Sequence, residues 1–403
     1  MDLSFLPRFP FALGDVSIIA LILLAGLGTG ELFRRVLLLP RISGYVLAGV
    51  LLGPGTFGLL DRSMLDAAQL VLDIALGLIL FELGSRLDWP WFRRNRWLLA
   101  SSLAEIVLSF TLLWLLLAAL HMPLLHAAIA AAIGVATGAS VLLVVIHDQR
   151  ADGPLTDRAV NLTALNNVFA VVAVTMLLAA LHLQYRPGVT TLLLQPLYLL
   201  LGSTLLGYAI SIVLVLLARW LGKREDLQFI ALVAMVLLTV GVAKALQLSM
   251  LVSLLALGVM ARNRDRARHL LPVEFGPSAQ VLFVVLFVLT GAAVTLGELA
   301  AGAGMALAYV LVRLVGKLIG VVMFSGPSGL SSRKAGLLAL TLMPMSATAV
   351  AMVDATARYY PQFGERVASV VLGAVLILEL TAPLATQLAL RAAGEARADA
   401  GSR

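Results

Sequence analysis

The sequence predicts an all-α polytopic membrane protein with about 13 transmembrane helices, on the basis of composition, run length and the placement of basic residues. Hydrophobic residues make up 61% of the chain and charged residues 13%, whereas soluble domains carry about 25% charge. Apolar runs of roughly 20 residues are long enough to cross a hydrocarbon core of ~30 Å at ~1.5 Å per residue. They lack strand alternation, which favours helices over a β-barrel.

The spans follow one another along the chain, separated by short loops that hold most of its charge. Six are expected in a first half and six in a second half, with a linker span near 190–219 between them. The first six are expected near 15–37, 42–60, 66–86, 97–120, 124–146 and 160–182. The last six are expected near 227–244, 248–262, 278–296, 299–324, 335–355 and 367–391.

The basic residues test this count, because cytoplasmic loops of membrane proteins are enriched in Lys and Arg. In this arrangement, 21 of the 29 basic residues fall in alternate loops and in the tail. An odd number of spans therefore fits best, in an inner (plasma) membrane, with the N-terminus outside and the C-terminus cytoplasmic. Residues 392–403 are expected to form a short cytoplasmic tail, with no soluble regulatory domain.

Several classes of function are excluded at this stage. The chain has no cysteine, which excludes disulfides and thiolate metal sites. Its five histidines show no metal-ligand spacing, and no P-loop or dinucleotide fingerprint is present. We expect no cofactor, no resident metal and no enzyme activity. The net charge of +7 lies in loops between spans, so a nucleic-acid partner is not expected.

Three pairs of short, weakly similar segments, which we call echoes, predict an inverted repeat. A first repeat of about 15–182 and a second of about 227–391 would lie seven spans apart, which turns the second upside down. Each echo lies about 205 residues from its partner: 47–51 with 255–259, 80–83 with 286–289, and 138–141 with 346–349.

The fifth and twelfth spans are candidates for discontinuous helices that cross each other. Both carry small, hydroxyl or proline residues near the middle, which membrane helices tolerate where freed backbone groups line a cavity. Opposed half-helices would place dipole ends at the bilayer centre. The alternative is close packing through small residues. The expected breaks are at Gly138 and Pro344, and the polar residues beside them are Thr137, Ser140, Ser346 and Thr348.

Three segments resemble the sodium/hydrogen exchanger superfamily, in its bacterial cation:proton antiporter-2 branch. Residues 40–54 read PRISGYVLAGVLLGP, residues 81–88 read FELGSRLD, and residues 287–292 read FVLTGA. The resemblance covers nearly the whole chain and implies one transmembrane domain over 1–391. It also implies a homodimer in which a mobile core with crossed broken helices moves as an elevator.

The chain departs from this family at the middle of the sixth span. Members carry an aspartate there that binds the cation and the proton in turn, whereas residues 164–169 read ALNNVF. The amide oxygens of Asn166 and Asn167 can bind a cation, but an amide does not titrate. The alternative is an Asn pair that hydrogen-bonds neighbouring helices.

Six ionisable residues lie within predicted spans, where such groups are costly and usually functional or paired. They are Asp73, Glu82, Glu105, Arg313, Lys317 and Glu379. Arg313 and Lys317 are four apart and share a helix face. By resemblance, Lys317 occupies the basic position that pairs with the missing aspartate.

Glu105 is one candidate partner for Lys317, and Asp73 and Glu82 are others. Nine residues separate Asp73 from Glu82, which puts them on opposite helix faces. Glu82 could stand in for the missing aspartate, or could pair with Arg86 one turn away. For Glu379 we expect a structural pairing.

The leading hypothesis is a secondary active transporter that exchanges a monovalent cation, sodium or potassium, for protons by alternating access. The alternative is a relative that is not proton-coupled or does not transport, because Asn167 replaces the usual aspartate.

Overall fold

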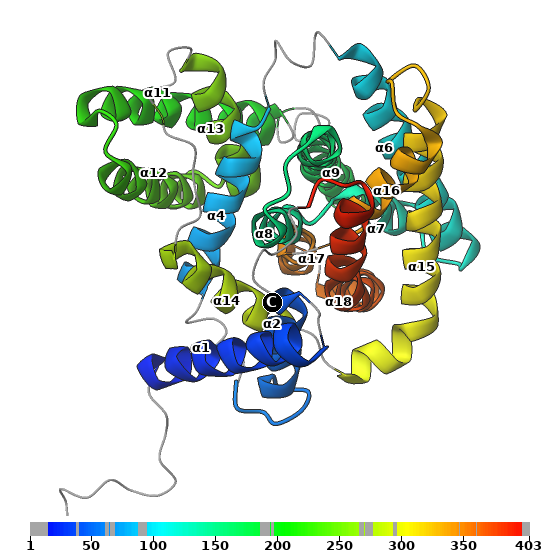
Figure 1. Cartoon of the computed structure of the whole chain (residues 1–403). Helices are drawn as coiled ribbons and strands as arrows, with labels where there is room; N and C mark the ends of the chain where they lie inside the picture. The colour runs from blue at the N-terminus through cyan, green and yellow to red at the C-terminus, as the bar shows by residue number, and fades with distance from the viewer. Residues whose placement is uncertain are drawn as a thin grey trace, which may run out of the picture.

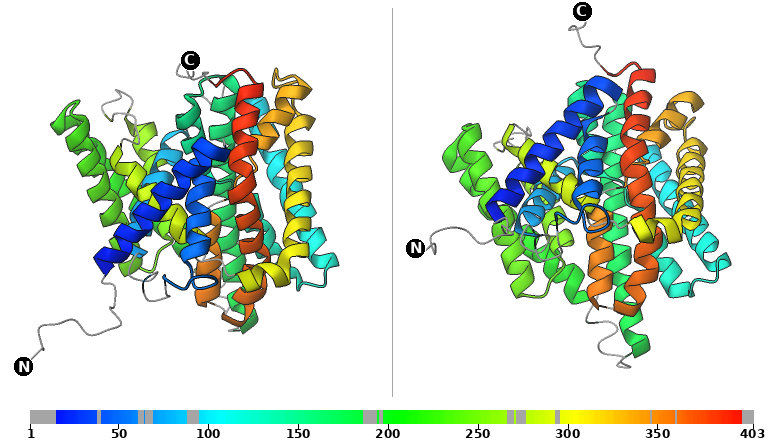
Figure 2. Two further views of the ribbon diagram at one scale, coloured as in Figure 1. Left: turned by 60° about the horizontal axis from the view of Figure 1, so that its bottom comes forward. Right: turned by 90° about the horizontal axis from the view of Figure 1, so that it is seen from below.

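The computed structural model describes residues 15–37, 40–60, 64, 69–87, 95–185, 194, 197–265, 270, 277–292, 296–345, 347–359 and 361–396. Every regular element in these residues is a helix. Eight helical segments are long and apolar enough to cross a membrane. Long helices such as α15 and α18 run side by side through the molecule (Figure 2).

The helices follow the predicted order. In the first half they are α1 (Asp15–Leu32) with the π-helix η1 (Phe33–Leu37), α2 (Arg41–Leu52), α4 (Gln69–Ser85), α6 (Arg96–Ala119), α7 (Leu124–Val135), α8 (Ala139–Gln149) and α9 (Pro154–Tyr185). Then come η2 (Tyr198–Gly202), α11 (Ser203–Leu221), α12 (Glu225–Ala245), α13 (Met250–Arg264), α14 (Pro277–Ala292), α15 (Leu296–Met323), α16 (Ser332–Thr341), α17 (Ala347–Tyr359) and α18 (Pro361–Ala392).

Each of the 13 predicted spans contains helix, and the all-α fold class is confirmed. The second span, expected over 42–60, is wrong in its extent, because α2 ends at Leu52. Gly53 precedes Pro54 and is extended, with ψ of 171°, since a residue before proline disfavours helical geometry. The chain then turns back, and the Thr56 hydroxyl donates to the carbonyl of Val50 at 2.5 Å.

The helices form two groups (Figure 1). We call α1, α2, α4 and α11–α14 the flanking bundle, and α6–α9 with α15–α18 the crossing bundle. In the flanking bundle, α2 packs on α14 and α4 packs on α13.

Glycines make both contacts of the flanking bundle close. A Cβ at Gly49 would lie 1.9 Å from the carbonyl oxygen of Val288, and one at Gly258 would lie 2.2 Å from that of Phe81. Gly49 and Gly258 are 209 residues apart, and Phe81 and Val288 are 207 apart. The glycine–carbonyl contact between α2 and α14 thus recurs between α13 and α4, with residues about 208 positions apart in each case. An inverted repeat would produce this pattern.

Candidate functional site

Two helices are interrupted in the crossing bundle, and the interruptions touch. α7 ends at Val135 and α8 begins at Ala139, while α16 ends at Thr341 and α17 begins at Ala347. The backbone N–H of Gly138 donates to the carbonyl of Pro344 at 2.7 Å. Proline lacks an N–H and disfavours helical geometry in the residue before it, which accounts for the second break. The predicted pair of crossed discontinuous helices is therefore present.

Arg313 of α15 satisfies the carbonyls that the two interruptions leave free. Its Nε donates to the carbonyl of Gly134 at 2.7 Å, and its two terminal nitrogens donate to Ala136 at 2.7 Å and Met343 at 2.5 Å. Longer contacts of 3.3 Å reach Leu342 and Pro344. The C-terminal ends of α7 and α16 carry partial negative charge, so a fully buried guanidinium stabilises both.

Lys317, one turn further along α15, forms a buried ion pair. Its Nζ lies 2.5 Å from Oε1 of Glu105 on α6, and neither side chain is exposed. The same nitrogen donates to the hydroxyl of Thr137 at 3.2 Å and to the carbonyl of Val135 at 3.3 Å. The partner that Lys317 requires is thus Glu105, one of the three expected candidates.

Two glycines let α6 approach α15 closely enough for this pair. A Cβ at Gly320 would lie 2.3 Å from Cα of Glu105, and one at Gly316 would lie 2.8 Å from Cα of Ser109. Close backbone approach through small residues is typical of membrane helix contacts. Gly316 and Gly320 on α15 therefore allow α6 to place the Glu105 carboxylate next to Lys317.

Asn166 and Asn167 on α9 join the same network through Thr137. The amide nitrogen of Asn166 donates to the Thr137 hydroxyl at 3.1 Å. That of Asn167 donates to the Thr137 carbonyl at 2.6 Å and to the Thr163 carbonyl at 2.9 Å. Both asparagines are fully buried. Thr137 thus connects the ion pair to the position where the family resemblance places the transported cation.

Several oxygens around this network have no hydrogen-bond partner among the described residues. They are Oδ1 of Asn166, Oδ1 of Asn167, Oε2 of Glu105 and Oγ1 of Thr163. A buried polar atom without a partner costs about 1–3 kcal/mol. Hard cations are bound by carboxylate, amide and hydroxyl oxygens. The four unpartnered oxygens are of the kinds that bind hard cations.

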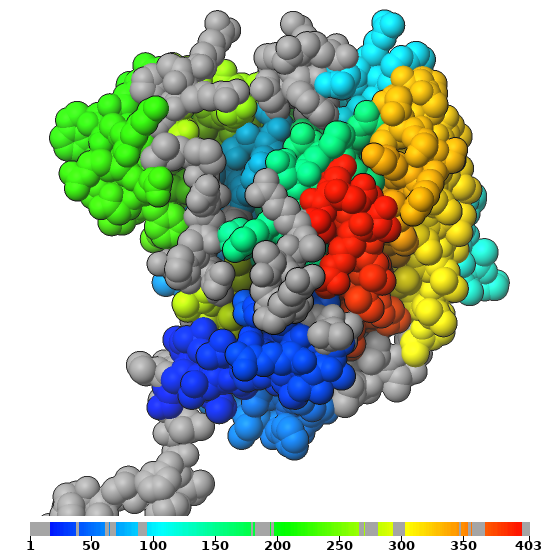
Figure 3. Space-filling view, in the orientation of Figure 1, coloured from blue at the N-terminus to red at the C-terminus, as the bar shows by residue number. Residues whose placement is uncertain are grey.

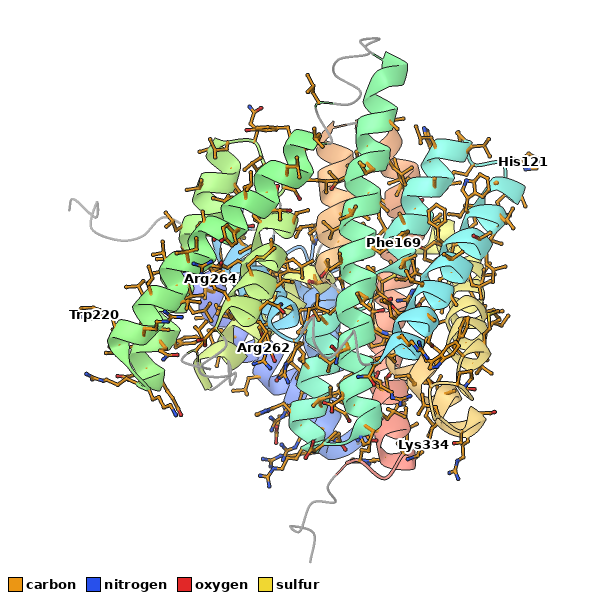
Figure 4. The ribbon with its side chains drawn as sticks, turned by 90° about the horizontal axis from the view of Figure 1, so that it is seen from above. His121, Phe169, Trp220, Arg262, Arg264 and Lys334 are labelled. Carbon is orange, nitrogen blue, oxygen red and sulfur yellow. The ribbon has the colours of Figure 1, made fainter. Side chains whose placement is uncertain are left out.

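The site lies near mid-length of the crossing bundle. Figure 4 shows Phe169, two residues beyond Asn167, about halfway along α9, with Lys334 towards one end of the molecule and His121 at the other. The Phe169 ring packs edge-on against Phe110 of α6, with ring centroids 6.3 Å apart.

The remaining predicted polar residues divide between the interruptions and the flanking bundle. Ser140 and Thr348 are buried in the first turns of α8 and α17, and Ser346 lies outside the described residues. Asp73 of α4 pairs with Lys244 of α12. Glu82 pairs with Arg86 at 3.0 Å.

Sequence reasoning missed Tyr309. Its hydroxyl donates to the carbonyl of Ala130 at 2.7 Å, and the side chain is fully buried. Tyr309, Arg313 and Lys317 follow at intervals of four residues, so all three face α7. This spacing could have identified Tyr309 from the sequence, because residues at i and i+4 lie on the same helix face.

The expected pairing of Glu379 is not found. Both carboxylate oxygens are buried, and neither has a hydrogen-bond partner in the part of the chain that the structure describes.

Comparisons with known proteins agree with this architecture. Residues 19–392 match the family model described as "Sodium/hydrogen exchanger, transmembrane". No curated protein sequence matches the chain.

Two solved structures of the sodium proton antiporter MjNhaP1 from Methanocaldococcus jannaschii share the fold. One, at pH 8, has a TM-score of 0.67 and 18% identity, and the match covers 94% of this chain and 99% of that one. The other, from electron microscopy, has a TM-score of 0.72 and 16% identity over 99% of this chain and 100% of that one.

Proposed function

Because the chain belongs to the sodium/hydrogen exchanger family of integral membrane transporters, we propose that it exchanges sodium or potassium for protons at the crossing of α7–α8 and α16–α17. The observation that carries the proposal is the buried pair of Lys317 and Glu105, hydrogen-bonded through Thr137 to the asparagines. It supplies a titratable group beside oxygens that can bind a cation.

The pair can exchange one proton for one cation without changing the net charge of the site. With Lys317 protonated, the ammonium neutralises the Glu105 carboxylate. A cation that binds the carboxylate and the asparagine oxygens replaces that positive charge, and the N–H bond of the ammonium breaks to release a proton to water. Reprotonation of Lys317 expels the cation. Burial favours this substitution, because a single unpaired charge is costly in the membrane interior.

Transport also requires the site to open to each side of the membrane in turn. We propose that the crossing bundle moves as an elevator against the flanking bundle, which would hold the contact of a homodimer. The recurring glycine contacts of α2–α14 and α4–α13 support an inverted repeat. The basic loops favour an N-terminus outside and a cytoplasmic C-terminus.

The alternative function is a relative without proton coupling. One observation favours it: the amide nitrogens of Asn166 and Asn167 hold the Thr137 segment in place, so the pair has a structural use. Asn167→Asp separates the two functions. If the native chain lacks coupling and the variant acquires it, the alternative holds.

The experiment is proton transport in proteoliposomes that contain a pH-sensitive dye. The proposal predicts a dye response to sodium or potassium in the native protein that Glu105→Gln removes. Lys244→Gln is the matched control, because Lys244 pairs with a carboxylate outside the crossing bundle. Absence of a native response to sodium, potassium and lithium between about pH 6 and 9, or an unchanged response in Glu105→Gln, contradicts the proposal.

A further inference from the structure

Glu379 is a buried carboxylate that the proposed exchange does not use. It lies in α18, which packs against α2, α7, α8 and α15–α17 (Figure 1), and its side chain is 1% exposed. The space-filling view shows the surface of α18 directly against those of α15 and α16 (Figure 3).

None of the charged residues on the helices around Glu379 forms an ion pair with it in the described part of the chain. The described titratable residues on those helices are Arg41, Tyr45, His126, His147, Asp148, Tyr309, Arg313, Lys317, Arg333 and Lys334. An isolated ionised carboxylate in such surroundings is costly, so it is stable only with a proton or a cation bound.

A proline opens the backbone of α18 at this residue. Pro383 lies four residues after Glu379 inside the helix and has no N–H, so the Glu379 carbonyl loses its helical hydrogen bond. The hydroxyl of Ser43 from α2 lies 3.4 Å from that carbonyl oxygen and donates to the Leu380 carbonyl at 3.2 Å. The Ser43 hydroxyl therefore meets the carbonyl that the proline frees, on the residue whose side chain is the buried carboxylate.

A further unpartnered oxygen continues the polar face of α18. Thr386 is fully buried, and its hydroxyl has no hydrogen-bond partner among the described residues. It follows Glu379 by seven residues, which places it on nearly the same helix face. This face leads from Glu379 towards the end of α18 at Ala392.

Glu379 lies at about the same depth in the bundle as the asparagines. The C-terminal end of α18 and the N-terminal end of α9 lie at the same end of the bundle, because Glu395 accepts a hydrogen bond from the backbone N–H of Leu155 at 2.8 Å. Asn167 lies 13 residues after Pro154, and Glu379 lies 13 residues before Ala392. At ~1.5 Å per residue, both are about 20 Å from that end. α8 packs against both α9 and α18.

We propose that Glu379 is a second ion-exchange site, a carboxylate that holds a proton when no metal ion is bound and releases it when an alkali cation binds. The O–H bond of the carboxyl group breaks, the proton passes to water, and the cation takes the place of the proton at the carboxylate. The binding step does not depend on the exchange at Lys317. Only its part in transport rests on the proposed function.

The test is cation-induced proton release from the purified full chain in weakly buffered detergent solution with a pH dye. Sodium or potassium chloride is added, with choline chloride as the control for ionic strength. Glu379→Gln is expected to lower the release by about half relative to the native protein, and Lys317→Gln is expected to remove the remainder. Glu82→Gln is the matched control, because Glu82 is a buried carboxylate with an ion-pair partner.

A second measurement does not depend on how well a variant folds. The infrared difference spectrum of the native protein is expected to lose a protonated-carboxyl band when the cation is added, and Glu379→Asp is expected to shift that band. Proton release unchanged in Glu379→Gln, or a native spectrum without this loss, overturns the proposal. Loss of release in Glu379→Gln with no effect of Lys317→Gln would support the second site and contradict the exchange at Lys317.

Discussion

The ion pairs of the crossing bundle and of the flanking bundle have the same chemistry and opposite surroundings. In the pair of Lys317 and Glu105, both side chains are 0% exposed. In two ion pairs of the flanking bundle the acidic partners, Asp73 and Glu82, are likewise buried, but their basic partners are 56% and 51% exposed. Lys244 and Arg86 can therefore keep their charge in contact with polar surroundings, as long basic side chains do near membrane surfaces.

On the proposed function, this difference separates charges that only stabilise the fold from charges that take part in exchange. An ion pair with one exposed partner adds little stability. A fully buried pair is costly to form and very sensitive to the loss of one member. Among the ion pairs in the described part of the chain, only this one is hydrogen-bonded to an interruption, through Thr137 and Val135. The contrast can be measured by unfolding variants of each group in detergent.

Removal of the Arg313 guanidinium should have the largest effect. Arg313→Gln would leave several buried carbonyls of α7 and α16 without their donor, and we expect a loss of about 5 kcal/mol in the free energy of unfolding. Arg313→Lys should recover only part of this loss, because an ammonium cannot span both helix ends. A variant as stable as the native chain would show that the interruptions do not need this charge.

Lys317→Gln should cost about 3–5 kcal/mol, because it leaves the Glu105 carboxylate buried without a partner. The double variant with Glu105→Gln should recover much of the stability, since no unpaired charge then remains. Equal losses in the single and double variants would mean that the two residues are not coupled.

Gly320→Ala should cost about 1–3 kcal/mol, because its added methyl group must displace the Glu105 backbone on α6. Gly304→Ala on the same helix is the control, since nothing lies within 4 Å of a Cβ there. If Gly320→Ala and Gly304→Ala lose the same free energy of unfolding, the close contact of Gly320 with α6 does not position Glu105.

Asp73→Asn should have the smallest effect, about 0–1 kcal/mol, because its ion-pair partner Lys244 is exposed. Cation-dependent proton release should also match that of the native protein. A loss of release would place Asp73 in the ion pathway and remove the distinction between the two bundles.

Most of the fold could be predicted from the sequence, because membrane spans are set by local composition and length. The interruptions were also visible, since Gly138 and Pro344 act on the backbone locally. The extent of α2 was missed because the apolar run continues past Leu52, although Gly53 and Pro54 already marked the turn.

The site was only partly predictable, because charge pairing depends on which helices touch. The sequence offered three acidic partners for Lys317, and the contact of α6 with α15 selects Glu105. Tyr309 was not singled out from the sequence, although its spacing matches that of Arg313. The unpaired state of Glu379 depends on every helix around α18, which no local pattern encodes.

The most direct test of the account is cation-driven proton flux through proteoliposomes of the double variant Glu105→Gln with Lys317→Gln. This variant removes the titratable pair without leaving an unpaired charge, so loss of folding and loss of exchange can be told apart. We predict a folded protein that has lost the cation-driven proton flux. Native proton flux in this variant would contradict the claim that this pair carries the exchanged proton.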